Sequence, residues 1–124
     1  MSEWPRIVTE WQSAWASLDA DRIVDLYTED AEHMSHVVTE RMGISSGTLK
    51  SRAAIRLYVD TSVKRLKSFR ADIISVISDG DDSNGRAAVE YWRIINDNED
   101  QRTRVIERIE WRNSKLTSCR VFHF

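Results

Sequence analysis

The sequence contains few of the residues that cross-link or interrupt a chain: of 124 residues, one is cysteine, one is proline and four are glycine. Because Cys119 is the single cysteine, an internal disulfide is excluded. A run of about 18 apolar residues, long enough to span a bilayer, is also missing, as is the apolar block of a signal peptide. These absences predict a cytoplasmic protein with no membrane partner.

A large excess of positive charge is missing as well. The chain has 18 basic and 20 acidic residues, interspersed along its length, for a formal net charge of -2. Such a chain presents no broad electropositive face to a phosphate backbone, so nucleic acid is not an expected partner. An apolar content of 41% is enough for one compact domain with a modest core, and we predict that residues 1–124 form a single domain.

Hydrophobic spacing predicts three helices in the first half of the chain. The first is marked by one stripe of apolar residues at intervals of four and three: Trp4, Val8, Trp11, Trp15 and Leu18. Ser2 is its candidate N-cap. A second, short helix has the predicted buried face Ile23, Leu26 and Tyr27. The third is expected from about 51 to 66, with Ser51 as its N-cap.

From Phe69 onward the hydrophobic period changes to two, which is typical of strands with one buried face. Turn signals at 79–85, 96–100 and 113–114 divide this part into four antiparallel strands. An earlier strand carries His33 and Ser35 on one face, and the stretch 42–49 is predicted as a loop that holds a short strand. Helices first and strands last indicate an α+β fold.

Three passages resemble one known superfamily. They are Asp21–Ala31 (DRIVDLYTEDA), Gly47–Tyr58 (GTLKSRAAIRLY) and the closing strand pair with Lys115 and Leu116 at its turn. The chain resembles the nuclear transport factor 2-like superfamily, among its SnoaL-like and ketosteroid isomerase-like domains. The resemblance implies a cystatin-like fold, in which a cone-shaped, curved antiparallel (mixed) sheet wraps around three N-terminal helices. Enzymes, binding subunits and dimerisation modules share this scaffold, so the fold alone leaves the function open.

One acid stands out among the residues expected to face the cone. Successive side chains of a strand point to opposite faces. On the fifth strand, the inward set is apolar except for Glu107: Val105, Glu107, Ile109 and Trp111. On the fourth strand, Glu90 fits the arginine-rich outer set better than a place opposite Glu107, because facing like charges destabilise a sheet. Tyr91 and Arg93 therefore point inward.

The resemblance supplies the orientation of the first and last long strands. It implies that His33 and Ser35 face the cone on the first, and that Cys119, Val121 and His123 face it on the last. The stripe of the first helix adds Trp11 and Trp15. The candidate ligand-binding residues are then Ser35, Tyr91, Arg93, Cys119, Trp11 and Trp15.

These residues suggest a cofactor-free acid/base enzyme of the isomerase, dehydratase or cyclase type, acting on a small hydrophobic, oxygenated molecule. The catalytic candidates are His33, Glu107 and His123. A carboxylate beside an imidazole in an apolar cavity can orient the ring and tune its pKa toward neutrality, and His33 with Glu107 is the sharpest such pair. Tyr91 would donate a hydrogen bond to a substrate oxygen.

The alternative is a non-catalytic module for ligand binding, dimerisation or assembly. Ser35 stands where the resemblance places the catalytic aspartate of ketosteroid isomerases, and the triad of limonene epoxide hydrolases is absent. Glu107 and Arg93 can also form a buried ion pair that does no chemistry. Cys119 fits an inert small hydrophobe.

No cofactor and no metal are predicted. The closest approach to a metal-ligand pattern is formed by Glu32, His33 and His36. Adjacent side chains on a strand diverge, and no further ligand spacing supports such a site.

The outer face of the predicted sheet carries an apolar patch made of Trp92, Ile94, Ile106, Phe122 and Phe124. Exposed patches of this kind usually mark an interface. Charged residues surround it and can form a polar rim: Arg104, Arg108, Arg120, Glu90 and Glu110. We therefore predict a homodimer through the outer sheet face, which the family resemblance also implies.

Overall fold

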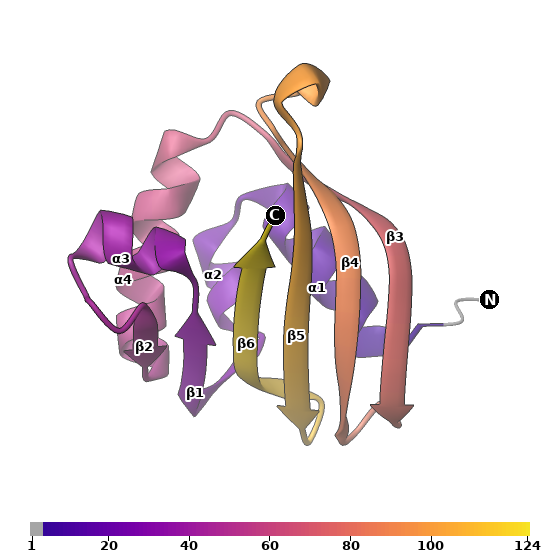
Figure 1. The fold of residues 1–124 in the computed structure, drawn as a ribbon. Helices are drawn as coiled ribbons and strands as arrows, with labels where there is room; N and C mark the ends of the chain where they lie inside the picture. Colours follow the sequence, from indigo (N-terminus) through magenta and orange to yellow (C-terminus); the bar gives the residue numbers. More distant parts are fainter. Residues whose placement is uncertain (1–3) are drawn as a thin grey trace.

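The computed structural model describes residues 4–124, so the candidate cap Ser2 lies outside the described residues. The helices are α1 (Arg6–Ser17), α2 (Ala20–Val24), α3 (His36–Met42), α4 (Arg52–Arg65) and the 3-10 helix η1 (Glu99–Gln101). The strands are β1 (Tyr27–Met34), β2 (Thr48–Lys50), β3 (Phe69–Gly80), β4 (Gly85–Ile95), β5 (Thr103–Arg112) and β6 (Lys115–His123). Figure 1 shows one curved sheet with α1, α2 and α4 behind it.

The sheet is mixed, with the strand order β2-β1-β6-β5-β4-β3. Strands β3 to β6 form the predicted antiparallel meander. Strand β1 joins it by pairing parallel to β6, and β2 pairs antiparallel to β1 at the edge. Between β5 and β6, Asn113 and Ser114 have φ values of 53° and 63°, the left-handed conformation that suits a two-residue hairpin turn. The expected α+β architecture, a curved mixed sheet with helices packed on one side, is confirmed.

The predicted helices at the two ends of the helical region are confirmed. Helix α1 buries Trp11 and Trp15 on the side that packs against β3. Helix α4 begins after Ser51, whose side chain accepts a hydrogen bond of 3.0 Å from the backbone N–H of Ala54. This contact satisfies one of the free donors at the helix start, as expected for an N-cap.

Three details of the helical region were predicted wrongly. Leu26 and Tyr27 are buried, but both lie beyond the second helix, which ends at Val24, and Tyr27 begins β1. The prediction of three N-terminal helices also missed α3, so four α-helices precede the meander in the described residues. Ser35, predicted on the first strand, is instead the N-cap of α3 and accepts a hydrogen bond from the Val37 N–H at 3.2 Å.

The inward and outward faces of the meander agree with the predicted alternation. Val89 and Tyr91 of β4 are buried, and so are Glu107 of β5 and Cys119 of β6. Ile94 was predicted on the exposed outer face, but it is only 2% exposed. It lies near the end of β4, the strand that η1 contacts. None of the helices in residues 4–124 is long and apolar enough to cross a membrane.

Candidate functional site

A small cavity lies between the helices and the concave face of the sheet. Its volume is about 60 Å³, and it is lined by Trp11, Trp15, His33, Ser35, Val37, Tyr58, Phe69, Tyr91, Arg93, Glu107, Val121 and His123. The lining includes all of the predicted site residues except Cys119. A larger hollow of about 850 Å³ lies between α2 and the start of α4, but it is open to solvent, and its Arg56 is paired with Asp21.

Glu107 is the acid of this cavity. It is 3% exposed, and burial raises its pKa from 4.5 to about 7. The Tyr91 hydroxyl donates a hydrogen bond of 2.9 Å to its Oε1, and this contact lowers the pKa less than burial raises it. The Trp11 indole and the Cys119 thiol also lower the pKa of Glu107, as Tyr91 does. Glu107 can therefore both take up and release a proton near neutral pH.

His33 is a neutral imidazole in the same cavity. Burial lowers its pKa from 6.5 to about 4. Its ring packs on those of Tyr58 and Tyr27, at centroid distances of 5.4 and 6.4 Å. Its Nδ1 is buried and has no hydrogen-bond partner within residues 4–124. Within residues 4–124 the predicted pair of His33 and Glu107 is not joined by a hydrogen bond: Glu107 accepts from Tyr91, and Nδ1 of His33 has no partner.

His123 is held by Arg93 at one side and by His36 at the other. Arg93 Nη1 lies 3.0 Å from His123 Nε2. Because a guanidinium can only donate, Nε2 accepts, and a neutral His123 carries its proton on Nδ1. That nitrogen lies 3.1 Å from Nδ1 of His36, the first residue of α3. Partial burial, then the charge of Arg93 and the neighbouring His36, lower the pKa of His123 to about 4.

The alternative of a buried Glu107–Arg93 ion pair is contradicted by this arrangement. Arg93 has no ion-pair partner among the described residues, and it bonds to His123. Cys119 is fully buried outside the cavity lining, and its pKa is raised by burial and by Glu107. This position agrees with the interpretation of Cys119 as a small hydrophobic residue without a chemical role.

Sequence reasoning missed several aromatic and apolar lining residues. Tyr58 lies on the buried face of α4 with Ile55 and Val59, so its helical spacing from these apolar residues was the signal that could have found it. Phe69 opens β3 and packs on Trp15 with a ring-centroid distance of 5.7 Å. Val37 belongs to the unexpected helix α3. In the described part of the chain, no group of three or more histidine, cysteine, aspartate or glutamate residues could hold a metal ion.

Comparison with known proteins gives one family. The model of the SnoaL-like domain matches residues 8–119. No curated protein sequence matches the chain.

Solved structures share the fold at low sequence identity. A SnoaL-like protein of unknown function from Burkholderia thailandensis has a TM-score of 0.77 and 18% identity, with 96% of this chain and 92% of that chain covered. A protein from Sinorhizobium meliloti, provisionally assigned as a polyketide cyclase, has a TM-score of 0.74, 14% identity and coverages of 97% and 96%. A ketosteroid isomerase-like protein from Catenulispora acidiphila, solved with trimethylamine, has a TM-score of 0.70, 17% identity and coverages of 95% and 85%.

Proposed function

The chain belongs to the SnoaL-like domain family, and from this premise we propose that it is a cofactor-free enzyme that acts on a small hydrophobic, oxygenated molecule by acid/base catalysis. The observation that carries the proposal is Glu107, a buried acid with a pKa of about 7 that lines an aromatic cavity. A general acid or base works best when its pKa lies near the working pH.

The reaction that fits these groups is proton transfer at a carbon next to a carbonyl. Ionised Glu107 takes the proton, the C–H electron pair moves toward the carbonyl oxygen, and an enolate forms. In a substrate with a C=C bond next to the deprotonated carbon, the charge extends along the conjugated system, and return of the proton to its far carbon shifts the double bond and completes an isomerisation. Tyr91 donates to Glu107, so it holds the carboxylate in place and favours its ionised form.

His33 is suited to stabilise the enolate. Its imidazole is neutral near pH 7, since its pKa is lowered to about 4. As the Nδ1–H tautomer it would donate a hydrogen bond to the substrate oxygen from a nitrogen that has no partner in residues 4–124. His123 is bound to Arg93, so we assign it the role of positioning Arg93 at the cavity wall.

The test is deuterium exchange of small ketones, because it needs no knowledge of the natural substrate. Cyclopentanone and 2-pentanone are incubated with the protein in D2O, and loss of their α-proton signals is followed by NMR. We expect catalysed exchange that rises with pH around a pKa of about 7. Glu107→Gln should slow it by roughly 100-fold or more.

The matched control is Glu110→Gln, which alters an acid three residues further along β5 on the opposite face of the strand. It should exchange the ketones as fast as the unmodified protein. Equal exchange rates for Glu107→Gln and Glu110→Gln would refute the proposed role of Glu107.

The second candidate is a binding or assembly module without turnover. The cavity volume of about 60 Å³ favours it, because most of the cone is filled by the protein's own side chains. Binding of a ketone without catalysed exchange at any pH from 5 to 9, a range of about two pH steps on each side of neutrality, would support this candidate.

A further inference from the structure

Arg93 is a cation that reaches the cavity without a counter-ion. We propose that Arg93 binds the carboxylate of the ligand, so that the site takes a small carboxylic acid with a reactive C–H group. The inference deepens the proposed function, on which its catalytic part rests, by naming the class of substrate. Three properties of Arg93 support this inference: its hydrogen-bond and ion-pair partners within the chain, the orientation of its guanidinium group, and its position on β4.

Arg93 differs from the arginines that a neighbouring acid neutralises. Arg56, Arg70 and Arg104 each form an ion pair with at least one acid. Arg93 forms none within residues 4–124, and its Nε is buried without a hydrogen-bond partner there. An unpaired, partly buried charge is costly, so the fold retains a group whose partner is best supplied from outside the chain.

The free edge of the guanidinium suits a carboxylate. His123 occupies Nη1 at 3.0 Å, which fixes the orientation of the guanidinium plane. The Nε and Nη2 groups form no hydrogen bond to a described residue. Two parallel N–H donors of this kind hold the two oxygens of a carboxylate in a bidentate contact.

The charge of Arg93 acts into the cavity. It lowers the pKa of Tyr91 and of Tyr58, although burial raises both by more, and it contributes to the lowered pKa of His123. Arg93 also lines a polar hollow of about 260 Å³ on another side, together with Asn98 and Gln101. Because the charge is felt by residues of the cavity lining, the cavity is the side to which we assign the carboxylate.

The strand register sets the distance between this subsite and the acid. Glu107 pairs with Val89, and Arg93 follows Val89 by four residues on β4. Four residues of strand span roughly 13 Å, so the backbone positions of Glu107 and Arg93, which both line the cavity, are separated by about this distance along the sheet. Their long side chains shorten the gap. A ligand with a short apolar span between its carboxylate and its reactive carbon matches this spacing, and 4-oxopentanoate is such a probe.

The experiment compares 4-oxopentanoate with its neutral methyl ester. Binding is measured by tryptophan fluorescence, since Trp11 and Trp15 line the cavity. We expect the acid to bind at least 10-fold more tightly than the ester. Arg93→Met should abolish this preference, and Arg93→Lys should retain part of it. Arg108→Met, which removes an arginine from the outer face of β5, is the matched control and should keep the full preference.

Three results would overturn the subsite: equal binding of acid and ester, an acid preference that persists in Arg93→Met, or amide shifts confined to the hollow on the other side of Arg93. Amide chemical shifts locate the probe. Shifts at Tyr58 and Val121 support the cavity, whereas shifts confined to Asn98 and Gln101 overturn it. Circular dichroism confirms that each variant is folded, and Arg93→Gln takes the place of Arg93→Met if Arg93→Met does not fold.

The fate of the probe's own protons separates this inference from the proposed function. Acid preference that depends on Arg93, without exchange that depends on Glu107, supports the subsite and refutes the catalytic proposal. Exchange of neutral ketones that depends on Glu107, without acid preference, supports the catalytic proposal and refutes the subsite.

Discussion

Glu107 and His33 share one buried environment and respond to it in opposite ways. Burial penalises the charged form of each group. It therefore raises the pKa of the acid to about 7 and lowers that of the imidazole to about 4. Both groups are mainly uncharged in mildly acidic solution, and Glu107 becomes the charged member as the pH rises. Near neutral pH the cavity therefore holds Glu107 as an acid that can exchange a proton and His33 as a neutral hydrogen-bonding group.

The shifted pKa of Glu107 predicts a pH-dependent effect of Glu107→Gln on stability. The folded pKa of about 7 exceeds the ordinary value of 4.5, so the folded state binds the proton more tightly than the unfolded state. The free energy of unfolding contributed by Glu107 therefore falls as pH rises from about 4.5 to about 7, by about 3 kcal/mol. Glu107→Gln should gain stability relative to the unmodified protein over this range, as measured by urea unfolding.

Glu110→Gln, on the outer face, should show no comparable trend. His33 has the opposite effect on the free energy of unfolding: because its pKa is lowered, stability is lost as pH falls from 6.5 to about 4. This effect is present in both the unmodified protein and Glu107→Gln. Its contribution cancels when Glu107→Gln is compared with the unmodified protein at each pH. A difference between the two proteins that stays constant from pH 4.5 to 7.5 would contradict a pKa of about 7 for Glu107.

At the residue level, the sequence predicted which side chains share the cavity better than it predicted their partners. Glu107 was recognisable as one acid within an apolar inward set, because strand alternation assigns faces directly. Alternation carries no information on rotamers or on distances across the cone. The expected pairs of Glu107 with His33 and with Arg93 were therefore replaced by Tyr91–Glu107 and Arg93–His123.

Helix α3 is the element that sequence reasoning did not predict. It has only seven residues, and its N-cap Ser35 was taken as the continuation of an alternating strand. The usable signals were Ser35 as a cap and Gly43, which ends the helix at a φ of 69°. The longer helices and the meander were predictable because their periodicity extends over many residues. Short helices depend on tertiary contacts, here those with β2 and α4.

Two glycines of the α3 region predict a measurable difference in stability. Gly43 and Gly47 both have a φ of 69°, so replacement by alanine costs about 1 kcal/mol at each through the backbone alone. A Cβ at Gly43 would meet nothing within 4 Å. A Cβ at Gly47 would lie 3.0 Å from the backbone oxygen of Ser35 and 3.1 Å from Oγ1 of Thr39. We expect Gly47→Ala to cost about 1–2 kcal/mol more than Gly43→Ala, as measured by chemical denaturation. Equal losses would show that the start of α3 shifts freely.

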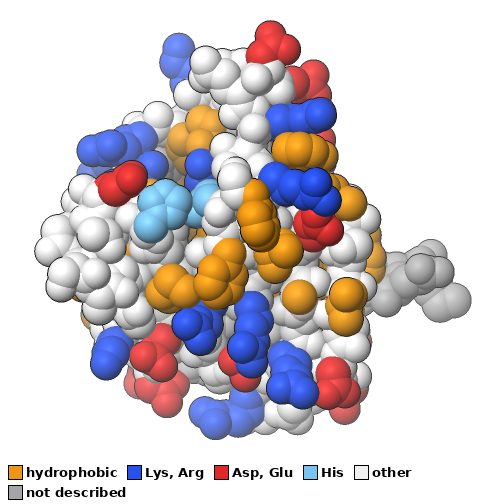
Figure 2. Space-filling model, in the orientation of Figure 1, with side chains coloured by type: hydrophobic (Ala, Val, Ile, Leu, Met, Phe, Trp, Pro, Cys, Tyr) orange, Lys and Arg blue, Asp and Glu red, His pale blue; other side chains and the backbone are white. Residues whose placement is uncertain are grey.

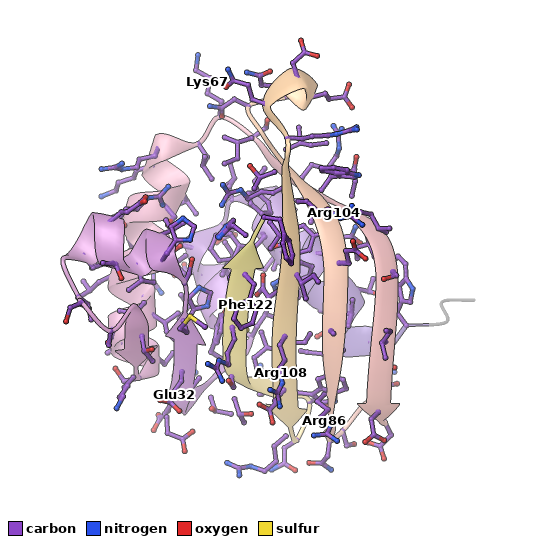
Figure 3. The ribbon with its side chains drawn as sticks, in the orientation of Figure 1. Glu32, Lys67, Arg86, Arg104, Arg108 and Phe122 are labelled. Atoms are coloured by element: carbon purple, nitrogen blue, oxygen red, sulfur yellow. The ribbon has the colours of Figure 1, made fainter. Side chains whose placement is uncertain are left out.

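At the scale of the whole molecule, the outer face of the sheet is the surface that lacks a cover. Phe122 is 42% exposed and Phe124 75% exposed on this face. Figure 2 shows hydrophobic side chains gathered across the middle of the face, with lysine and arginine side chains below them. In Figure 3, Phe122 and Arg108 stand on the same side of the sheet. Exposed aromatic side chains ringed by charge are typical of an interface.

The charges of this face are incompletely paired within one chain. Arg108 and Arg120 face each other across β5 and β6, and neither forms an ion pair in residues 4–124. Glu32 and Glu110 line the same outer hollow as these two arginines, and they too lack an ion-pair partner there. A second copy placed by two-fold symmetry can bring acids of one protomer against arginines of the other, because such an interface is self-complementary. This arrangement supports the proposal of a homodimer through the outer sheet face.

The homodimer predicts that a charge at Phe122 separates the protomers. Phe122→Asp should convert a dimer into a folded monomer, as measured by light scattering during size-exclusion chromatography at tens of micromolar protein, because the aspartate would lose its water within an apolar contact. The matched control is Leu57→Asp, since Leu57 is 61% exposed and lies on α4. It should leave the dimer intact. A monomeric unmodified protein at the same concentration, or a dimer that survives Phe122→Asp, would refute a homodimer through this face.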